Sequence, residues 1–314
     1  MAVTALVVEQ DGGTSPVFPR RKRRNLGALG LLVGASVLIA VATGYPLVRQ
    51  FVTSFQHYGL KQQFGAPPEW VGLQNYQELL SDPYVWAVIG RSIAFCLVNA
   101  AVTMLVGVGI AVLLQRVSRL ARMTLMVSLL LAWGTPVLAS MTVWQWLFDS
   151  QYGVINWVLA HVFGMEDMAG HSWIIQPLSF YFVATVIVVW MSVPFVAFSV
   201  YAGLLQVPEE TMEAAQLDGA SSRQRFWNIT IPMIRPVLSI VLLLQVIWDL
   251  KVFTQIYVLQ RAGAPTRETN LLGTLIYSYA KEFSLAGALA TIMLVLTLAL
   301  TGFYIRQMLK EDEL

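Results

Sequence analysis

The stretch "SFYFVATVIVVWMSVPFVAFSVYAGL", Ser179 to Leu204, contains no charged side chain. An α-helix rises 1.5 Å per residue, so roughly 20 apolar residues are enough to cross a hydrocarbon core of about 30 Å. Inside lipid every backbone polar group must find its hydrogen-bond partner within the protein, which makes a helix the expected form. The stretch therefore predicts a membrane-spanning helix.

Five further apolar runs of similar length surround this stretch. The chain of 314 residues is 57% hydrophobic and only 12% charged, with a mean hydropathy of +0.64, far outside the range of soluble proteins. The sequence thus predicts an all-α polytopic membrane protein with six transmembrane helices, and the net charge of +2 gives no indication of nucleic-acid binding. The other five runs are Leu26 to Val48, Ile89 to Leu114, Met123 to Phe148, Val237 to Leu259 and Leu285 to Ile305.

The first run has an alternative interpretation as a secretory signal. The basic block Arg20 to Arg24 precedes it, and "AVA" at Ala40 to Ala42 resembles a cleavage site. The run continues to Val48, longer than a usual signal core, and this length favours a retained helix with a cytoplasmic anchor. Residues 1–25 are expected to form a disordered basic tail.

Lysine and arginine set the expected orientation. Basic residues gather at one set of helix ends, whereas Asp149 to Gln176 contains neither Lys nor Arg. The positive-inside rule then places both termini in the cytoplasm. The expected organisation is a tail at 1–25, the first transmembrane helix at 26–50, an extracytoplasmic segment at 51–88, a transmembrane domain at 89–306 with a cytoplasmic loop at 208–232, and a tail at 307–314.

Motifs for nucleotide or metal binding are missing from the sequence. The chain has one cysteine, Cys96, in an apolar run, and three histidines, His57, His161 and His171, without metal-ligand spacing. A P-loop is excluded because the sequence contains no Gly-Lys pair. We expect no metal, catalytic residue or cofactor in this chain, so any ATP and Mg²⁺ must be bound by another subunit.

The cytoplasmic loop begins with a short predicted helix. Pro208, Glu209 and Glu210 are typical of a first helical turn, because proline needs no donor there and carboxylates oppose the positive helix end. Gly219 is expected to end this helix.

A second short helix is predicted after the glycine. Ser221 and Gln224 have the spacing of a capping box, Phe226 and Ile229 follow at helical spacing, and Pro232 is expected to stop the helix. The pair of helices is too short and polar to cross a membrane. It is suited either to docking into a partner or to lying on lipid headgroups.

The residues of this loop carry a specific resemblance. "EAAQLDGASSRQRFWNITIPMIRP", Glu213 to Pro236, is similar to the EAA loop of permease subunits in binding-protein-dependent ABC importers, with Ile231 where leucine is usual. In that family the loop inserts into a cleft of the ATP-binding subunit. The resemblance implies a coupling role for Glu213, Ala214, Ala215, Asp218, Gly219, Ala220, Arg223, Phe226 and Pro232.

Other segments resemble the carbohydrate permeases of the maltose type. They are "GYPLVRQFVTSF" (Gly44 to Phe55), "VGLQNYQELLSDPYVW" (Val71 to Trp86), "WQWLFDSQYGVINWVL" (Trp144 to Leu159) and "KVFTQIYVLQ" (Lys251 to Gln260). The resemblance implies a bacterial-type plasma membrane, a second related permease, two ATP-binding subunits, an extracytoplasmic solute-binding protein and a sugar substrate. Thr254 and the segment Ala262 to Pro265 depart from the family pattern, which leaves the sugar's identity open.

Ionisable residues inside membrane helices are costly and mark functional candidates. Asp249 and Lys251 are such residues, and Gln245, Trp248 and Asp249 share one helix face. An indole with an amide and a carboxylate can stack on and hydrogen-bond to a sugar. Alternatively, Trp248 packs against a neighbouring helix and Asp249 pairs with a cation.

Polar residues beside two prolines are weaker candidates for the substrate path. They are Thr135, next to Pro136, and Trp190 and Ser192, close to Pro194. Two other function classes stay open at this point. One is a secondary transporter or channel, and the other is an ABC permease for a non-sugar solute such as a phosphorylated polyol, peptide or amino acid.

Overall fold

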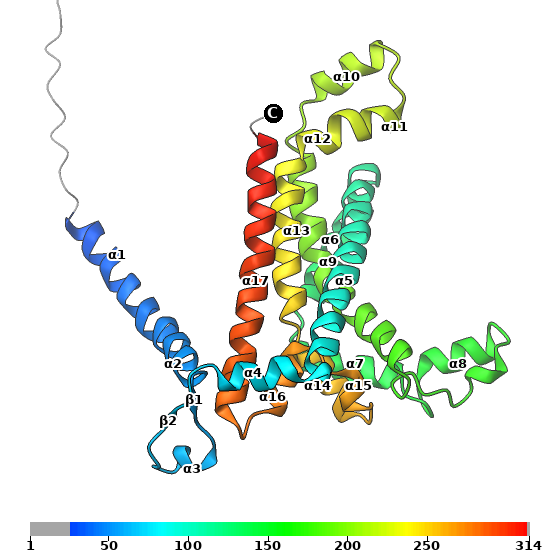
Figure 1. The fold of residues 1–314 in the computed structure, drawn as a ribbon. Coiled ribbons are helices and arrows are strands. Elements are labelled where there is room, and N and C mark those ends of the chain that lie inside the picture. The colour runs from blue at the N-terminus through cyan, green and yellow to red at the C-terminus, as the bar shows by residue number, and fades with distance from the viewer. Residues whose placement is uncertain (1–25, 313–314) are drawn as a thin grey trace, which may run out of the picture. The chain divides into compact units, whose positions relative to one another are not determined.

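The computed structural model describes residues 26–312, and nearly all of them are helical (Figure 1). The all-α prediction is confirmed, since β structure in the described part is limited to one antiparallel pair, β1 (Gln56–His57) and β2 (Glu69–Trp70). The expected basic tail at 1–25 lies outside the described residues. The chain divides between Arg49 and Gln50 into two units. The first holds α1 (Leu26–Ile39), a π-helical turn (Ala40–Gly44) and the start of α2 (Tyr45–Thr53).

The second unit contains the remaining helices. In chain order they are α3 (Leu60–Gln63), α4 (Gln74–Ser81), α5 (Pro83–Arg116), α6 (Arg119–Gly134), α7 (Val137–Leu147), α8 (Val154–His161), the 3₁₀ turn η2 (Glu166–Met168), α9 (Pro177–Leu204), α10 (Glu209–Leu217), α11 (Ser222–Arg225), the π turn η3 (Phe226–Thr230), α12 (Ile231–Met233), α13 (Arg235–Leu250), α14 (Thr254–Arg261), α15 (Thr266–Thr269), α16 (Leu272–Ser278) and α17 (Phe283–Asp312).

Five helical segments of the described chain are long and apolar enough to cross a membrane, and a bent pair brings the total to six. Two helices extend beyond the apolar runs that predicted them. Helix α5 begins at Pro83 instead of Ile89, because Asp82 caps it by accepting a hydrogen bond from the Tyr84 amide. Helix α17 continues to Asp312, so most of the expected tail at 307–314 is helical.

The third apolar run, predicted as one transmembrane helix, forms two helices that join at a sharp bend. Helices α6 and α7 meet at Thr135 and Pro136 with a bend of 103°. Both residues have non-helical backbone, with ψ of 127° at Thr135 and 135° at Pro136. The proline ring disfavours a helical conformation at Thr135, the residue before it. Hydropathy measures how apolar a segment is and does not reveal its direction.

The fifth run is interrupted as well. Helix α13 ends at Leu250 and α14 begins at Thr254, so Lys251 is an exposed residue at the break and does not lie inside a helix as expected. Helix α16 approaches this break closely. A methyl group on Gly273 would lie 2.9 Å from the carbonyl oxygen of Val252, which explains why glycine suits that position.

Close packing of α5 against α9 forms the centre of the second unit. Gly107 makes it possible, since a methyl group built on it would lie 2.5 Å from Cγ1 of Val196. A methyl group built on Gly109 would meet no atom within 4 Å, so only one of these two glycines is needed for the close packing. At the end of the unit where α7 lies, a buried apolar cluster packs α7, α9 and α14 together through Met141, Phe180 and Ile256.

Candidate functional site

The predicted cytoplasmic loop consists of two short helices that project from one end of the second unit (Figure 1). Helix α10 begins after Pro208, with Glu209 and Glu210 in its first turn, as predicted. Carboxylates at this position stabilise the positive end of the helix.

Gly219 ends α10 and turns the chain. Its φ of +82° lies in the left-handed region, which costs a non-glycine residue roughly 1–2 kcal/mol. The Gly219 amide donates to the carbonyl of Gln216 (3.1 Å) and the Ala220 amide to that of Ala215 (2.9 Å). This is a Schellman motif, which satisfies the last carbonyls of the helix. The predicted end of the first helix is confirmed.

The capping box that opens α11 is confirmed too. The Ser221 amide donates to Oε1 of Gln224 at 2.9 Å, and the Gln224 amide donates to Oγ of Ser221 at 3.4 Å. The prediction that Pro232 stops this helix was wrong. The chain continues through η3 into α12, where Pro232 sits in the first turn, a position that needs no amide donor.

Arg225 joins the two helices of the loop. Its Nη1 donates to Oε1 of Gln216 at 2.8 Å and to the carbonyl oxygen of Met212 at 3.4 Å, both on α10. A guanidinium is suited to this because its donors have a fixed planar geometry. The contact fixes the angle between α10 and α11. Neither Arg225 nor Gln216 is among the residues to which the resemblance assigns a coupling role.

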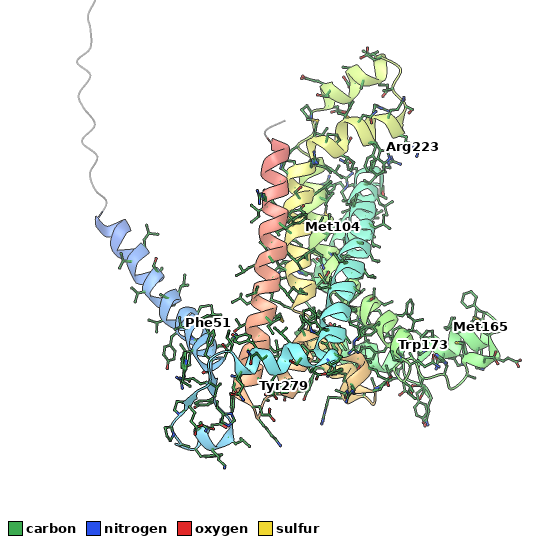
Figure 2. The ribbon with its side chains drawn as sticks, in the orientation of Figure 1. Phe51, Met104, Met165, Trp173, Arg223 and Tyr279 are labelled. Carbon is green, nitrogen blue, oxygen red and sulfur yellow. The ribbon has the colours of Figure 1, made fainter. Side chains whose placement is uncertain are left out.

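The exposed side of the loop brings together most residues assigned to coupling. Glu213, Ala214, Asp218, Gly219, Arg223 and Pro232 are exposed, whereas Ala215, Ala220 and Phe226 are half-buried. Figure 2 shows Arg223 at this end of the unit and Trp173 at the opposite end. Leu217 was missed, although it is 89% exposed and stands between polar neighbours. The available signal was a leucine between two polar residues, Gln216 and Asp218, on a loop too polar to cross a membrane.

The three substrate-path candidates on one face of α13, Gln245, Trp248 and Asp249, lie in two different environments. Gln245 and Asp249 are buried, and Nε2 of Gln245 donates to both carboxylate oxygens of Asp249 at 2.9 Å. Among the described residues this amide, and no cation, contacts the carboxylate. Helix α5 lies beside the pair, where Sγ of Cys96 donates to the Val246 carbonyl at 3.4 Å.

Trp248 occupies a different environment from its two neighbours. It is 43% exposed and packs edge-on against Phe195, with ring centroids 4.9 Å apart. The structure therefore brings Gln245 and Asp249 together and leaves Trp248 open on one side.

The weaker substrate-path candidates, Trp190, Ser192 and Thr135, lie on other helices or beside the bend between α6 and α7. Trp190 is 36% exposed and meets Trp144 of α7 edge-on at 5.7 Å, while Ser192 is half-buried on the same helix. The Thr135 hydroxyl donates to the Leu131 carbonyl at 2.7 Å, beside the bend between α6 and α7. Helix α9 remains one helix through Pro194.

Known proteins resemble this chain over most of its length. It is 40% identical to the diacetylchitobiose uptake system permease protein DasB of Streptomyces coelicolor, over 98% of this chain and 95% of that protein. It is 31% identical to the trehalose/maltose transport system permease protein MalF of Thermococcus litoralis, over 75% of this chain and 79% of that one.

A solved structure shares the fold. The chain of a bacterial ABC transporter involved in the import of the acidic polysaccharide alginate superimposes with a TM-score of 0.78 at 18% identity, covering 90% of this chain and 95% of that chain. The family described as the binding-protein-dependent transport system inner membrane component matches residues 103–311, which include the whole loop at 208–232. The helical spans and the relatives agree, and the chain belongs to this family of multi-pass plasma-membrane permeases.

Proposed function

We propose that this chain is one of two related permease subunits of an ATP-driven importer for N,N′-diacetylchitobiose or a disaccharide of similar size. The observation that carries the proposal is the 40% identity to a diacetylchitobiose permease across 98% of the chain. Family membership removes the secondary-transporter alternative, because members depend on a binding protein. A non-sugar solute becomes an outcome of the test below.

The loop at 208–232 is the proposed contact with the ATP-binding subunit. Leu217 provides an apolar side chain for a cleft, and Glu213, Asp218 and Arg223 provide charges at its rim. ATP and Mg²⁺ are bound by that subunit. One permease supplies one loop and two ATP-binding subunits need two, so the proposed core contains two permeases and two ATP-binding subunits, together with the solute-binding protein.

The proposed substrate path follows the exposed polar and aromatic groups near the two helix breaks. Trp248 and Trp190 offer aromatic faces for the C–H side of a sugar ring. Lys251 and Ser192 offer hydrogen-bond donors to sugar hydroxyl groups, and Oγ1 of Thr135, whose proton is donated to the Leu131 carbonyl, offers an acceptor. Gln245 and Asp249 are closed to solvent in this conformation, so they contact sugar only in a state where α5 and α13 separate.

Transport requires two states with different affinities for nucleotide. ATP must bind the outward-facing state more tightly than the inward-facing state, since a ligand with equal affinity for both shifts no equilibrium. The loop at 208–232 transmits this difference in free energy to α9 and α13, the helices on either side of it.

A cysteine crosslink combined with uptake tests the proposal. Ala215→Cys in a Cys96→Ala background, paired with a cysteine in the cleft of the ATP-binding subunit, should crosslink in a nucleotide-dependent manner. Cells with the complete system should accumulate labelled N,N′-diacetylchitobiose. A missing crosslink with lipid-phase labelling at position 215 would indicate an interfacial helix instead, and uptake of a phosphorylated polyol in place of saccharides would overturn the substrate class.

A further inference from the structure

A polar cavity of about 470 Å³ lies on the second unit between α14, α15 and α16, and no substrate-path candidate is among its lining residues. We propose that it is an entry subsite that holds one ring of a neutral saccharide before the sugar reaches the membrane interior. This rests on the proposed function and adds a site to it. Its volume falls within the range of roughly 300–1,000 Å³ that is usual for small-molecule pockets. The lining residues that would contact the sugar are Tyr257, Gln260, Arg261, Asn270, Tyr277 and Ser278.

Aromatic rings form one wall of the cavity. Tyr277 meets Tyr257 edge-on with ring centroids 5.0 Å apart, and Tyr257 stacks on Phe253 at 5.3 Å. Tyr277 is 52% exposed, so one of its faces is open to a ligand. An aromatic face stacks on the C–H side of a sugar ring, while the tyrosine hydroxyl hydrogen-bonds to sugar hydroxyls.

Another wall of the cavity is a hydrogen-bonded amide network. Nε2 of Gln260 donates to Oγ1 of Thr269 at 3.1 Å and to Oδ1 of Asn270 at 3.0 Å, and Nδ2 of Asn270 donates to Oη of Tyr84 at 2.9 Å. Both amide hydrogens of Gln260 are thus used, which leaves its Oε1 as the acceptor for a sugar hydroxyl. Gln260 is 8% exposed, so its position is fixed before a ligand arrives and little entropy is lost on binding.

Contacts with α5 hold this wall in place. The Arg91 guanidinium donates to the carbonyl oxygens of Arg267 and Glu268, and the Arg267 guanidinium lies 4.8 Å from the centre of the Tyr84 ring. Helix α15 is thereby attached to a long helix of the unit and is not a free loop. A rigid support of this kind is what a precise binding site needs.

The cavity also adjoins the break in the fifth apolar run. Phe253, the last residue of that break, stacks on Tyr257 in the cavity wall, and Trp248 lies near the end of α13 just before the break. The cavity and the α13 candidates therefore flank one short segment, Lys251 to Phe253. A sugar that leaves the cavity along this segment can contact Tyr257, which follows the segment in the chain, and then Trp248, which precedes it.

Protection of an engineered cysteine tests the subsite. Ser278→Cys is placed in a Cys96→Ala background, and the assembled transporter in proteoliposomes is labelled with a membrane-impermeant maleimide. N,N′-diacetylchitobiose should slow labelling of position 278 several-fold. The matched control is Ser150→Cys, which lines a separate cavity near α8 and should label at the same rate with or without the sugar.

Two further variants identify the cause of the protection. Tyr277→Leu should abolish the protection and Tyr277→Phe should retain most of it, because stacking needs the ring and not the hydroxyl. Normal import of the sugar with equal labelling of position 278 in its presence and absence would overturn the subsite alone. Failure to import any saccharide would overturn the proposed function, and the subsite with it.

Discussion

Gly107 and Gly109 are separated by one residue, yet the structure gives them different roles. A methyl group on Gly107 would collide with Val196 of α9, whereas one on Gly109 would meet open space. We expect Gly107→Ala to destabilise the protein by about 1–3 kcal/mol through overpacking. Gly109→Ala should leave stability unchanged or raise it by up to about 1 kcal/mol, since alanine is the better helix former. Thermal unfolding midpoints of the two purified variants would show the difference, and equal midpoints would contradict the packing of α5 on α9.

Leu217 offers a second prediction for a single residue. A leucine that is 89% exposed on a docking loop gains about 1.5–3 kcal/mol when a partner buries it. Leu217→Ser should therefore weaken binding of the ATP-binding subunit about 10- to 100-fold, by the conversion of 1.4 kcal/mol per factor of ten. Affinity measured with the chain in nanodiscs checks this. Leu178→Ser is the control, since Leu178 is 85% exposed at the other end of the unit, and an equal loss there would remove Leu217 from the interface.

Arg225 makes α10 and α11 act as one element, and this gives a prediction about the pair. Arg225→Ala and Gln216→Ala each break the 2.8 Å hydrogen bond between the helices, so each should lower the transport rate. Because both remove the same contact, the double variant should be no slower than the slower single variant. Uptake rates of the three variants at equal expression give the answer. Additive losses would show that the two side chains act separately.

Local chemistry made most of this loop predictable from the sequence. The left-handed glycine at 219 and the capping box at Ser221 each depend on residues within one or two turns, and both are present in the structure. The same reasoning failed at Pro232, because a proline in a first helical turn and a proline after a last turn look alike in a sequence.

The sequence predicted where the membrane-spanning helices lie along the chain, but it did not predict where those helices bend or break. Each apolar run forms helix, but a proline in the sequence does not reveal the 103° angle of the bend at Pro136, and the break after Leu250 lies where the distant helix α16 packs against Val252. The burial of Gln245 and Asp249 beside an open Trp248 likewise depends on which helices surround α13. Helical periodicity places Gln245, Trp248 and Asp249 on one face of the helix, but it does not show which other helices pack against that face.

At the scale of the whole molecule, charge is distributed unevenly between the two ends of the second unit. The junction of α5 and α6 carries Arg116, Arg119 and Arg122, and it lies at the same end as α10 and α11 (Figure 1). The segment from Asp149 to Gln176, at the opposite end, has neither Lys nor Arg. The positive-inside rule therefore assigns the first end to the cytoplasm, where an ATP-binding subunit is available.

This assignment predicts which engineered cysteines react from which side. In a Cys96→Ala background, Ser222→Cys on α11 should react with a membrane-impermeant maleimide in inside-out vesicles and not in spheroplasts. Ser150→Cys, in the segment without Lys or Arg, should react in spheroplasts and not in inside-out vesicles. The two substitutions replace the same residue type, so a difference in labelling reports the side of the membrane and not the chemistry of the site. Labelling of both positions from one side would refute the arrangement of spans, and with it the docking of the loop at 208–232 to a cytoplasmic ATP-binding subunit.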